Sequence, residues 1–143
     1  NLETVKNLER IGDLAMNLTE FFEMVQEDKD SFTPHAVKDI NDMFAQLVDM
    51  LDDCVEIYVT KDMDSYLLLE KKENKMDQME YDARLRHFQR MAKNECPSSV
   101  AASVYCDILG TLERMADHAC NIAKSAVFET QDDISPDELL PNK

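Results

Sequence analysis

Residues 112–123 read LERMADHACNIA, and residues 8–19 read LERIGDLAMNLT. Six of the twelve positions are identical: Leu, Glu, Arg, Asp, Ala and Asn. The apolar residues recur at steps of three and four, the spacing of one buried face of an α-helix. They are Leu8, Ile11, Ala15, Leu18 and Phe22 and, correspondingly, Leu112, Met115, Ala119, Ile122 and Ala126. The two stretches therefore predict two amphipathic helices that are related by an internal repeat and lie near opposite ends of the chain.

Helix start and stop signals divide the rest of the sequence. Thr33 and Pro34 form a good start signal, because Thr caps helix N-termini and Pro favours the first helical position. Asp62 is a second candidate cap, and the run Cys96-Pro97-Ser98-Ser99 is typical of a turn followed by a new helix. We expect four helices, covering roughly residues 2–27, 34–60, 62–94 and 99–128.

The connections between these helices are short, and only Gly12, Gly110 and four prolines interrupt the chain. Short connections make consecutive long helices antiparallel neighbours. The sequence therefore predicts an all-α fold, an antiparallel up-and-down four-helix bundle over residues 1–128. Residues 129–143 are acidic, contain two prolines and lack periodicity, so we expect a disordered tail or the start of a linker.

Composition excludes several classes of function. The 143 residues carry a net charge of −15, which repels nucleic acids and anionic lipid and attracts cations. A surface this acidic is not expected to bind phosphate directly unless a cation bridges the two.

No apolar stretch approaches the roughly 20 residues of a spanning helix, and no signal peptide is recognisable. The first residue is Asn1 and not Met, which we interpret as a sign of excision from a longer protein.

The four cysteines show no CxxC spacing, so neither a thiolate zinc site nor a disulfide framework is predicted. We interpret them as reduced thiols that act as small core residues. They are Cys54, Cys96, Cys106 and Cys120.

Polar residues of the repeat are candidates for metal binding. They recur at i, i+4 and i+8 on one helix face, as Glu9, Asp13 and Asn17 and again as Glu113, Asp117 and Asn121. Two carboxylates so placed repel each other, and a bound cation reverses the sign of that interaction. Oxygen ligands suit hard ions such as Mg²⁺, Ca²⁺, Mn²⁺ or oxidised iron. Other acidic pairs, such as Glu23/Glu27, share the spacing, so one pair alone indicates only a solvated face.

Helix register selects one further acidic pair, Glu73 and Asp77. If the turn between the third and fourth helices is centred near residue 96.5, Asp77 and Asp117 lie within about 2 Å of the same height at ~1.5 Å per residue. We therefore expect Glu73, Asp77, Glu113 and Asp117 to converge on one patch between two antiparallel helices. Helix rotation is not fixed by sequence, so solvated carboxylates remain the alternative.

The sequence lacks the motifs of the enzyme classes that we considered. A di-iron carboxylate bundle needs Glu-x-x-His twice, whereas the residues three before the histidines are Phe32, Arg84 and Met115. Neither Gly-x-Ser-x-Gly nor a phosphate-binding glycine loop is present. His118, which follows Asp117, is either an additional ligand or a surface histidine. We expect a protein that is not an enzyme.

The doubled motif at Leu8–Leu18 and Leu112–Ile122 resembles the PhoU family of phosphate-uptake regulators. That family contains two three-helix repeats, each ending in such a helix, and two Glu/Asp-xxx-Asp motifs per repeat that bind metal. The resemblance implies that Glu73–Asp77 and Glu113–Asp117 form the complete site of the second repeat, and that Glu9 and Asp13 are half of the first. The chain would then hold the last helix of one repeat and all three helices of the next. The metal would be divalent or trivalent: iron, zinc, magnesium or manganese.

One branch of the family is especially similar. Arg86-His87-Phe88, Glu95-Cys96-Pro97 and the run 105–114, YCDILGTLER, resemble the PhoU-like domain at the C-terminus of bacterial sodium/phosphate cotransporters. This resemblance implies a cytoplasmic regulatory domain at the inner face of the membrane. Its partner would be a transporter in the same or another chain. The domain could also form homo-oligomers, and it would not bind nucleic acid. A free-standing PhoU-type regulator and a metal-free interaction bundle are the alternatives.

Overall fold

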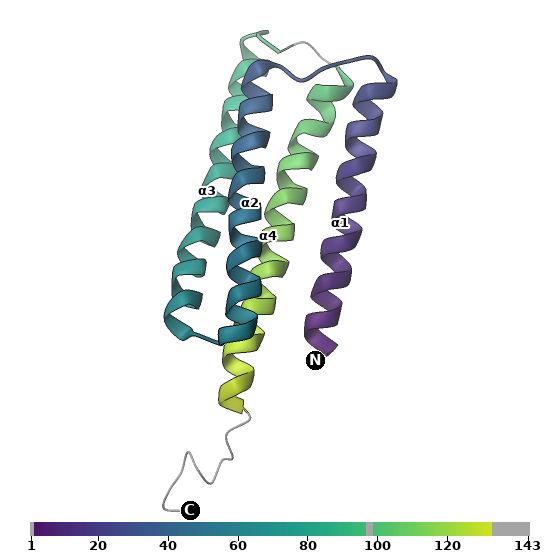
Figure 1. Ribbon diagram of the computed structural model, residues 1–143. Coiled ribbons are helices and arrows are strands. Elements are labelled where there is room, and N and C mark those ends of the chain that lie inside the picture. Colours follow the sequence, from purple (N-terminus) through teal and green to yellow (C-terminus); the bar gives the residue numbers. More distant parts are fainter. Residues whose placement is uncertain (1, 97–98, 133–143) are drawn as a thin grey trace, which may run out of the picture.

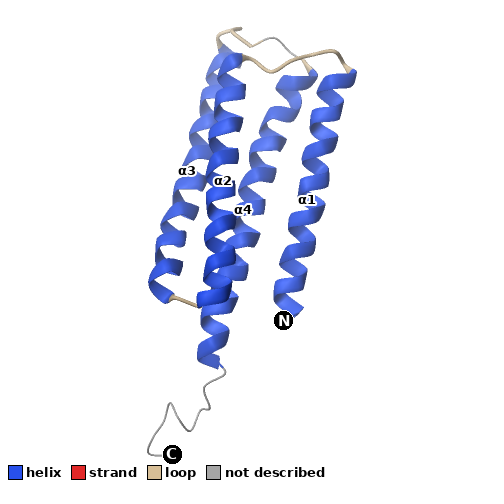
Figure 2. Cartoon of the chain, in the orientation of Figure 1, coloured by secondary structure: helices blue, strands red, loops and turns tan. Residues whose placement is uncertain are grey.

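The computed structural model describes residues 2–96 and 99–132, which form four long α-helices (Figure 1). They are α1 (Leu2–Glu27), α2 (Pro34–Thr60), α3 (Met63–Ala92) and α4 (Val100–Asp132). The described residues contain no strand (Figure 2), so the predicted all-α class is confirmed. The fourth helix continues to Asp132 and does not end near Phe128, and residues 133–143 of the predicted tail lie outside the described part of the chain.

Two of the predicted helix caps are present. The Thr33 hydroxyl accepts a hydrogen bond from the Ala36 amide at 3.2 Å, and this satisfies one of the unpaired donors at the start of α2. The Asp62 carboxylate accepts from the Ser65 amide at 3.0 Å and starts α3 in the same way. These local bonds explain why the sequence placed the helix starts correctly.

Helix α4 is the centre of the fold. It packs against each of the other three helices, and α2 also packs against α3. Helix α1 contacts α4 but neither α2 nor α3 within the described residues (Figure 1). The helices alternate in direction as predicted, but α2, α3 and α4 form a compact group of three with α1 added along the free side of α4.

The two copies of the repeat are buried to different extents. On α4 the whole predicted apolar stripe is buried: Leu112, Met115, Ala119, Ile122 and Ala126. On α1 the prediction is wrong at Leu8, which is 56 % exposed, and at Ala15, which is also exposed. The reason is that α1 packs on one side only, so its buried face is narrower and includes Thr4, Asn7 and Leu18.

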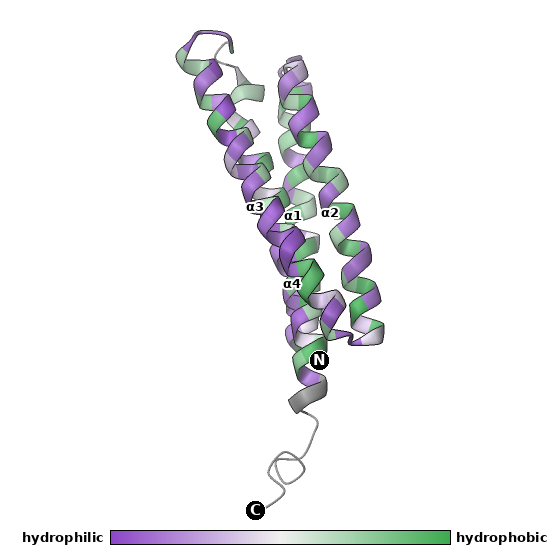
Figure 3. Cartoon of the chain, turned by 90° about the vertical axis from the view of Figure 1, so that its left-hand side faces the viewer, coloured by the Kyte–Doolittle hydropathy of each residue, from purple (hydrophilic) through white to green (hydrophobic). Residues whose placement is uncertain are grey.

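Helix α2 is rotated relative to the face that its apolar spacing predicts for the core. That face comprises Val37, Ile40, Phe44, Leu47, Leu51, Val55 and Tyr58. Its core face carries Met43, Leu47 and Met50, whereas Val55, which we expected in the core, is 66 % exposed. Val55 and Tyr58 of α2, with Leu8 and Ile11 of α1, line an open apolar groove of about 300 Å³ between the two helices. The outward surface of α3 is mostly hydrophilic (Figure 3). Within the described residues, none of the helices combines the length and the hydropathy needed to cross a membrane.

Candidate metal centre

The packing of α3 against α4 positions a cluster of carboxylates at the rim of their interface. Asp77, Glu113 and Asp117 each directly follow a residue with an exposure of 0 %, and these neighbours are Met76, Leu112 and Ala116. Because each neighbour is fixed in the core, the acidic side chain that follows it lies about 100° around the helix, at the edge of the core. The three carboxylates are therefore held by the same packing that joins the two helices.

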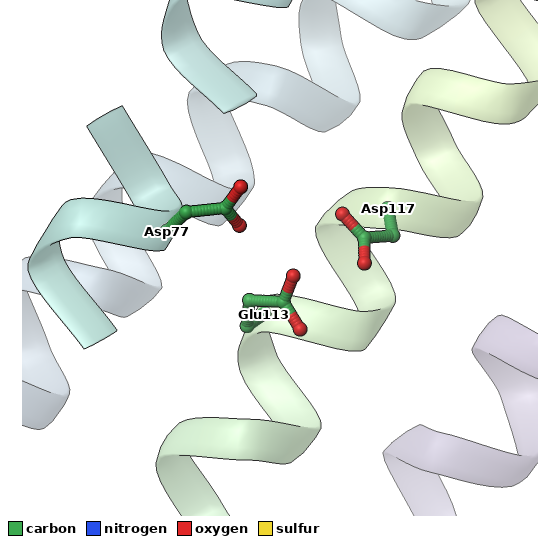
Figure 4. Close-up of side chains that lie close together, drawn as sticks. All are labelled: Asp77, Glu113 and Asp117. Carbon is green, nitrogen blue, oxygen red and sulfur yellow. The ribbon is translucent and has the colours of Figure 1, made fainter. Parts of the chain in front are cut away.

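The three carboxylate groups point toward one another (Figure 4). Asp77 extends from α3, Glu113 and Asp117 extend from α4, and one oxygen atom of each lies within 4.8 Å of the others. The carboxylates of Asp77 and Asp117, which residue counting placed at similar heights, thus lie close together. In the described residues no other group of three or more His, Cys, Asp or Glu side chains meets this spacing.

Glu73 belongs to the same cluster. Its carboxyl group is hydrogen-bonded to that of Asp117, and it also accepts a hydrogen bond from the Cys120 thiol. Three of the four acids that the sequence predicted to converge thus share one spacing, and Glu73 lies beside them through its contact with Asp117. We call these four residues, Glu73, Asp77, Glu113 and Asp117, the carboxylate cluster.

The cluster holds more negative charge than its surroundings compensate. Burial, followed by hydrogen bonds to the Asp117 and Asp77 carboxyl groups, raises the pKa of Glu113 to about 9. Burial and the hydrogen bond to Asp117 raise the pKa of Glu73 to about 7. In the described part of the chain no Lys or Arg forms an ion pair with any of the four acids. Both pKa values rise because these carboxyl groups are buried beside other acids and are not paired with any Lys or Arg that the structure describes.

This donor set fits a hard cation. Carboxylate oxygens are the preferred ligands of Mg²⁺, Mn²⁺, Ca²⁺ and oxidised iron, and zinc also accepts them. A cation held by Asp77, Glu113 and Asp117 would neutralise the charge that burial makes costly. With Glu73 the cluster offers four carboxylates from two helices.

The first copy of the motif is arranged differently. Glu9 and Asp13 are exposed on α1, and no third acidic, histidine or cysteine ligand joins them in the described residues. Asn17 and Asn121 are also exposed, and their role as additional ligands stays a prediction. The role of Glu9 and Asp13 as half of a site therefore stays a prediction.

His118 is turned toward α1. Its Nδ1 lies 2.9 Å from Oδ1 of Asn7, which is buried, so this pair links α1 to α4. Burial lowers the pKa of His118, and the nearby Arg10 lowers it further. Neither of these observations places His118 among the ligands of the cluster.

Two neighbours of the cluster were not predicted. Cys120 is buried beside Glu73, and burial together with this carboxylate raises the pKa of its thiol. The available signal was its position three residues after Asp117, on the same helix face. Glu80 also lies close enough to raise the pKa of Glu113, and it pairs with Arg84 at 2.7 Å. Glu80 follows Glu73 by seven residues, two helical turns.

Curated proteins are similar to this chain in sequence. The chain is 31 % identical over 127 residues to the phosphate-specific transport system accessory protein PhoU homolog 1 of Thermotoga maritima, covering 89 % of this chain and 53 % of that protein. It is 24 % identical over 147 residues to the protein of the same name from Mycobacterium leprae, covering 98 % of this chain and 61 % of that one. The chain thus spans between half and two thirds of these relatives. No solved structure matches it significantly.

The sequence profile of the PhoU domain matches residues 40–126, which include the whole carboxylate cluster and most of α2, α3 and α4. That match covers more than half of the chain, and the chain therefore belongs to the PhoU family.

Proposed function

We propose that this chain is a regulatory, non-catalytic domain that acts on phosphate transport and binds a divalent or trivalent cation through the carboxylate cluster. The observation that supports cation binding most strongly is the convergence of three carboxylates, with Glu73 beside them and no Lys or Arg paired to any of the four in the described residues. The bound cation would supply positive charge at the α3–α4 interface. The chain's own residues hold the two helices in register and keep the four carboxylates together.

The names of the relatives support the connection to phosphate. Both are named as accessory proteins of a phosphate-specific transport system, so a PhoU-type accessory protein acting on a separate transporter is the version they favour. The alternative is a domain joined to a sodium/phosphate cotransporter, which rests on the resemblance of residues 86–88, 95–97 and 105–114. In both versions the partner is a membrane transporter and the domain lies at the cytoplasmic face. Sequencing the gene upstream of the codon for Asn1 separates the two.

A second candidate is an interaction bundle that needs no metal. The open apolar groove between α1 and α2 favours this function, because contiguous exposed apolar surface commonly marks a contact with another protein. Both candidate functions are compatible with the same four helices. They differ because the interaction bundle would bind no ordered cation.

Phosphate uptake by cells tests the regulatory proposal. The chain is expressed in a bacterial strain whose own PhoU-family gene has been deleted, and uptake of radiolabelled phosphate is measured. We expect the wild-type chain to change the uptake rate and the Glu113→Gln/Asp117→Asn variant to lose that effect. The matched control is Glu23→Gln/Glu27→Gln, which removes an exposed pair of the same spacing from α1. An effect that the first variant retains in full would contradict a regulatory role for the cluster.

A further inference from the structure

Positive charge gathers at one end of this acidic protein. Four of its fifteen Lys and Arg residues fall within residues 84–93, a stretch without any Asp or Glu. Arg86, Arg90 and Lys93 from the end of α3 and His35 from the first turn of α2 line a pocket of about 200 Å³, together with Gln89 and Glu95. We call this the basic pocket. It lies where α2 begins and α3 ends (Figure 1).

Two arginines of the basic pocket are fixed in place by a buried polar network. The buried Asp39 carboxylate accepts a hydrogen bond from Arg86 at 2.8 Å and another from the Tyr105 hydroxyl at 2.9 Å. Arg90 in turn donates to the Tyr105 oxygen. The guanidinium groups are therefore positioned before any ligand arrives, which lowers the entropic cost of binding.

Three features leave the basic pocket short of negative charge. The Arg90 Nε atom is buried and has no hydrogen-bond partner, although a buried donor without one is costly. The first turn of α2 contains no acidic residue to offset the positive end of the helix dipole. Among the described residues that line the basic pocket, Glu95 is the one acid beside Arg86, Arg90 and Lys93, so the charge of the lining is positive even with His35 neutral. Asp39, which pairs with Arg86, lies with Asp42 and Asp82 along a separate neighbouring pocket.

We propose that the basic pocket binds a small tetrahedral oxyanion of the phosphate type. Guanidinium groups match the oxygens of such ions with paired hydrogen bonds, and the ammonium group of Lys93 adds a point charge. The net charge of −15 predicts that the surface as a whole repels phosphate, but salt screens distant charges over about 8–10 Å. The contacts within the pocket therefore decide binding.

The basic pocket is separate from the carboxylate cluster. Arg90 lies thirteen residues after Asp77 on α3, which is roughly 20 Å at 1.5 Å per residue. Oxyanion binding here needs no cation, so this inference does not rest on the proposed metal site.

Nuclear magnetic resonance of the metal-free, ¹⁵N-labelled full chain tests the proposal. Sodium phosphate is titrated at constant ionic strength against sodium chloride, and the Nε–H signals of Arg86 and Arg90 and the amide of His35 are followed. We expect saturable shifts with phosphate and none with chloride. Arg90→Gln and Lys93→Gln should each weaken binding about tenfold, the effect of losing one hydrogen bond to a charged group. Lys93 is exposed and outside the polar network, so its variant should fold even if that of Arg90 does not.

Two controls complete the experiment. Lys124→Gln, which removes an exposed charge from α4, should bind as the wild type does. Glu113→Gln/Asp117→Asn should also retain binding, which separates this site from the metal proposal. A parallel titration with ATP identifies the source of the phosphoryl group: tighter binding than free phosphate indicates a nucleotide, and equal or weaker binding indicates the free ion. Shifts that do not saturate, or unchanged binding by the Arg90 and Lys93 variants, would overturn the proposal.

Discussion

Asp77 of α3 and Asp117 of α4 present carboxylate oxygens within 4.8 Å of each other, although forty residues separate them in the chain. Like charges this close raise the free energy of the fold unless protons or a cation neutralise them. The elevated pKa values of Glu73 and Glu113 are the visible result in the metal-free protein.

The metal-free protein should become less stable as pH rises from about 5 to 9. Unfolded glutamates lose their protons near the ordinary value of 4.5, whereas folded Glu73 and Glu113 keep theirs up to about 7 and about 9. The folded state therefore binds more protons in this window, and stability falls as pH rises. We expect a loss on the order of 1–2 kcal/mol after solvent screening, seen as a lower Tm in chelator at the high end.

Two comparisons check the origin of that pH dependence. Glu113→Gln cannot ionise, so its Tm should vary less with pH than that of the wild type. Added Mn²⁺ or Mg²⁺ should raise the Tm at high pH more than at low pH, because the cation replaces protons that are absent there. A wild-type Tm that rises from pH 5 to 9 in chelator would contradict this explanation.

The two copies of the repeat should differ in their contribution to stability. Leu112 is fully buried at the centre of the fold, whereas its counterpart Leu8 is 56 % exposed. Leu112→Ala should cost about 2–5 kcal/mol, and Leu8→Ala less than about 1 kcal/mol. Urea denaturation followed by circular dichroism measures both. Equal losses would mean that α1 is packed more tightly than the structure describes.

Some features of the fold and of the site can be predicted from the sequence alone. The starts of α2 and α3 could be predicted because Thr33 and Asp62 form local caps that need no tertiary information. The equal heights of Asp77 and Asp117 followed from residue counting across one short connection. Both kinds of information are local or depend on helix geometry alone.

Other features depend on packing that the sequence does not encode locally. Adjacent apolar positions on α2, such as Met50 and Leu51 or Cys54 and Val55, allow two helix rotations, and packing against α3 and α4 selects the one observed. The exposure of Leu8 follows from α1 packing on α4 alone. The pairing of Asn7 with His118 joins polar residues 111 positions apart, which no spacing rule relates.

The buried network around Asp39 should contribute more stability than exposed ion pairs do. Tyr105→Phe removes one of the two hydrogen bonds to this buried carboxylate and should cost about 1–3 kcal/mol. The control is Lys38→Gln, which breaks the solvent-exposed pair of Lys38 with Asp42 and should change stability by less than about 0.5 kcal/mol. Thermal denaturation measures the loss of stability in both variants. A larger loss for Lys38→Gln than for Tyr105→Phe would contradict this prediction.

The cysteines should differ in reactivity. Cys54 and Cys120 are buried, and burial raises the pKa of both thiols, to about 11 for Cys54. Iodoacetamide at pH 8 should therefore leave both unmodified in the folded protein and alkylate both in urea. Mass spectrometry of peptides locates the modification. Rapid alkylation of Cys120 in the native state would show that the region beside Glu73 is open to solvent.

The most direct test of the central claim is the metal content of the purified chain. Protein prepared without chelator and loaded with Mn²⁺, Mg²⁺, Zn²⁺ or iron is dialysed and examined by elemental analysis. We predict that the wild type and Glu23→Gln/Glu27→Gln retain the same amount of metal, and that Glu113→Gln/Asp117→Asn retains little or none while keeping its helical circular dichroism spectrum. Metal retained equally by all three proteins, or by none of them, would contradict the claim that these four carboxylates form a cation site.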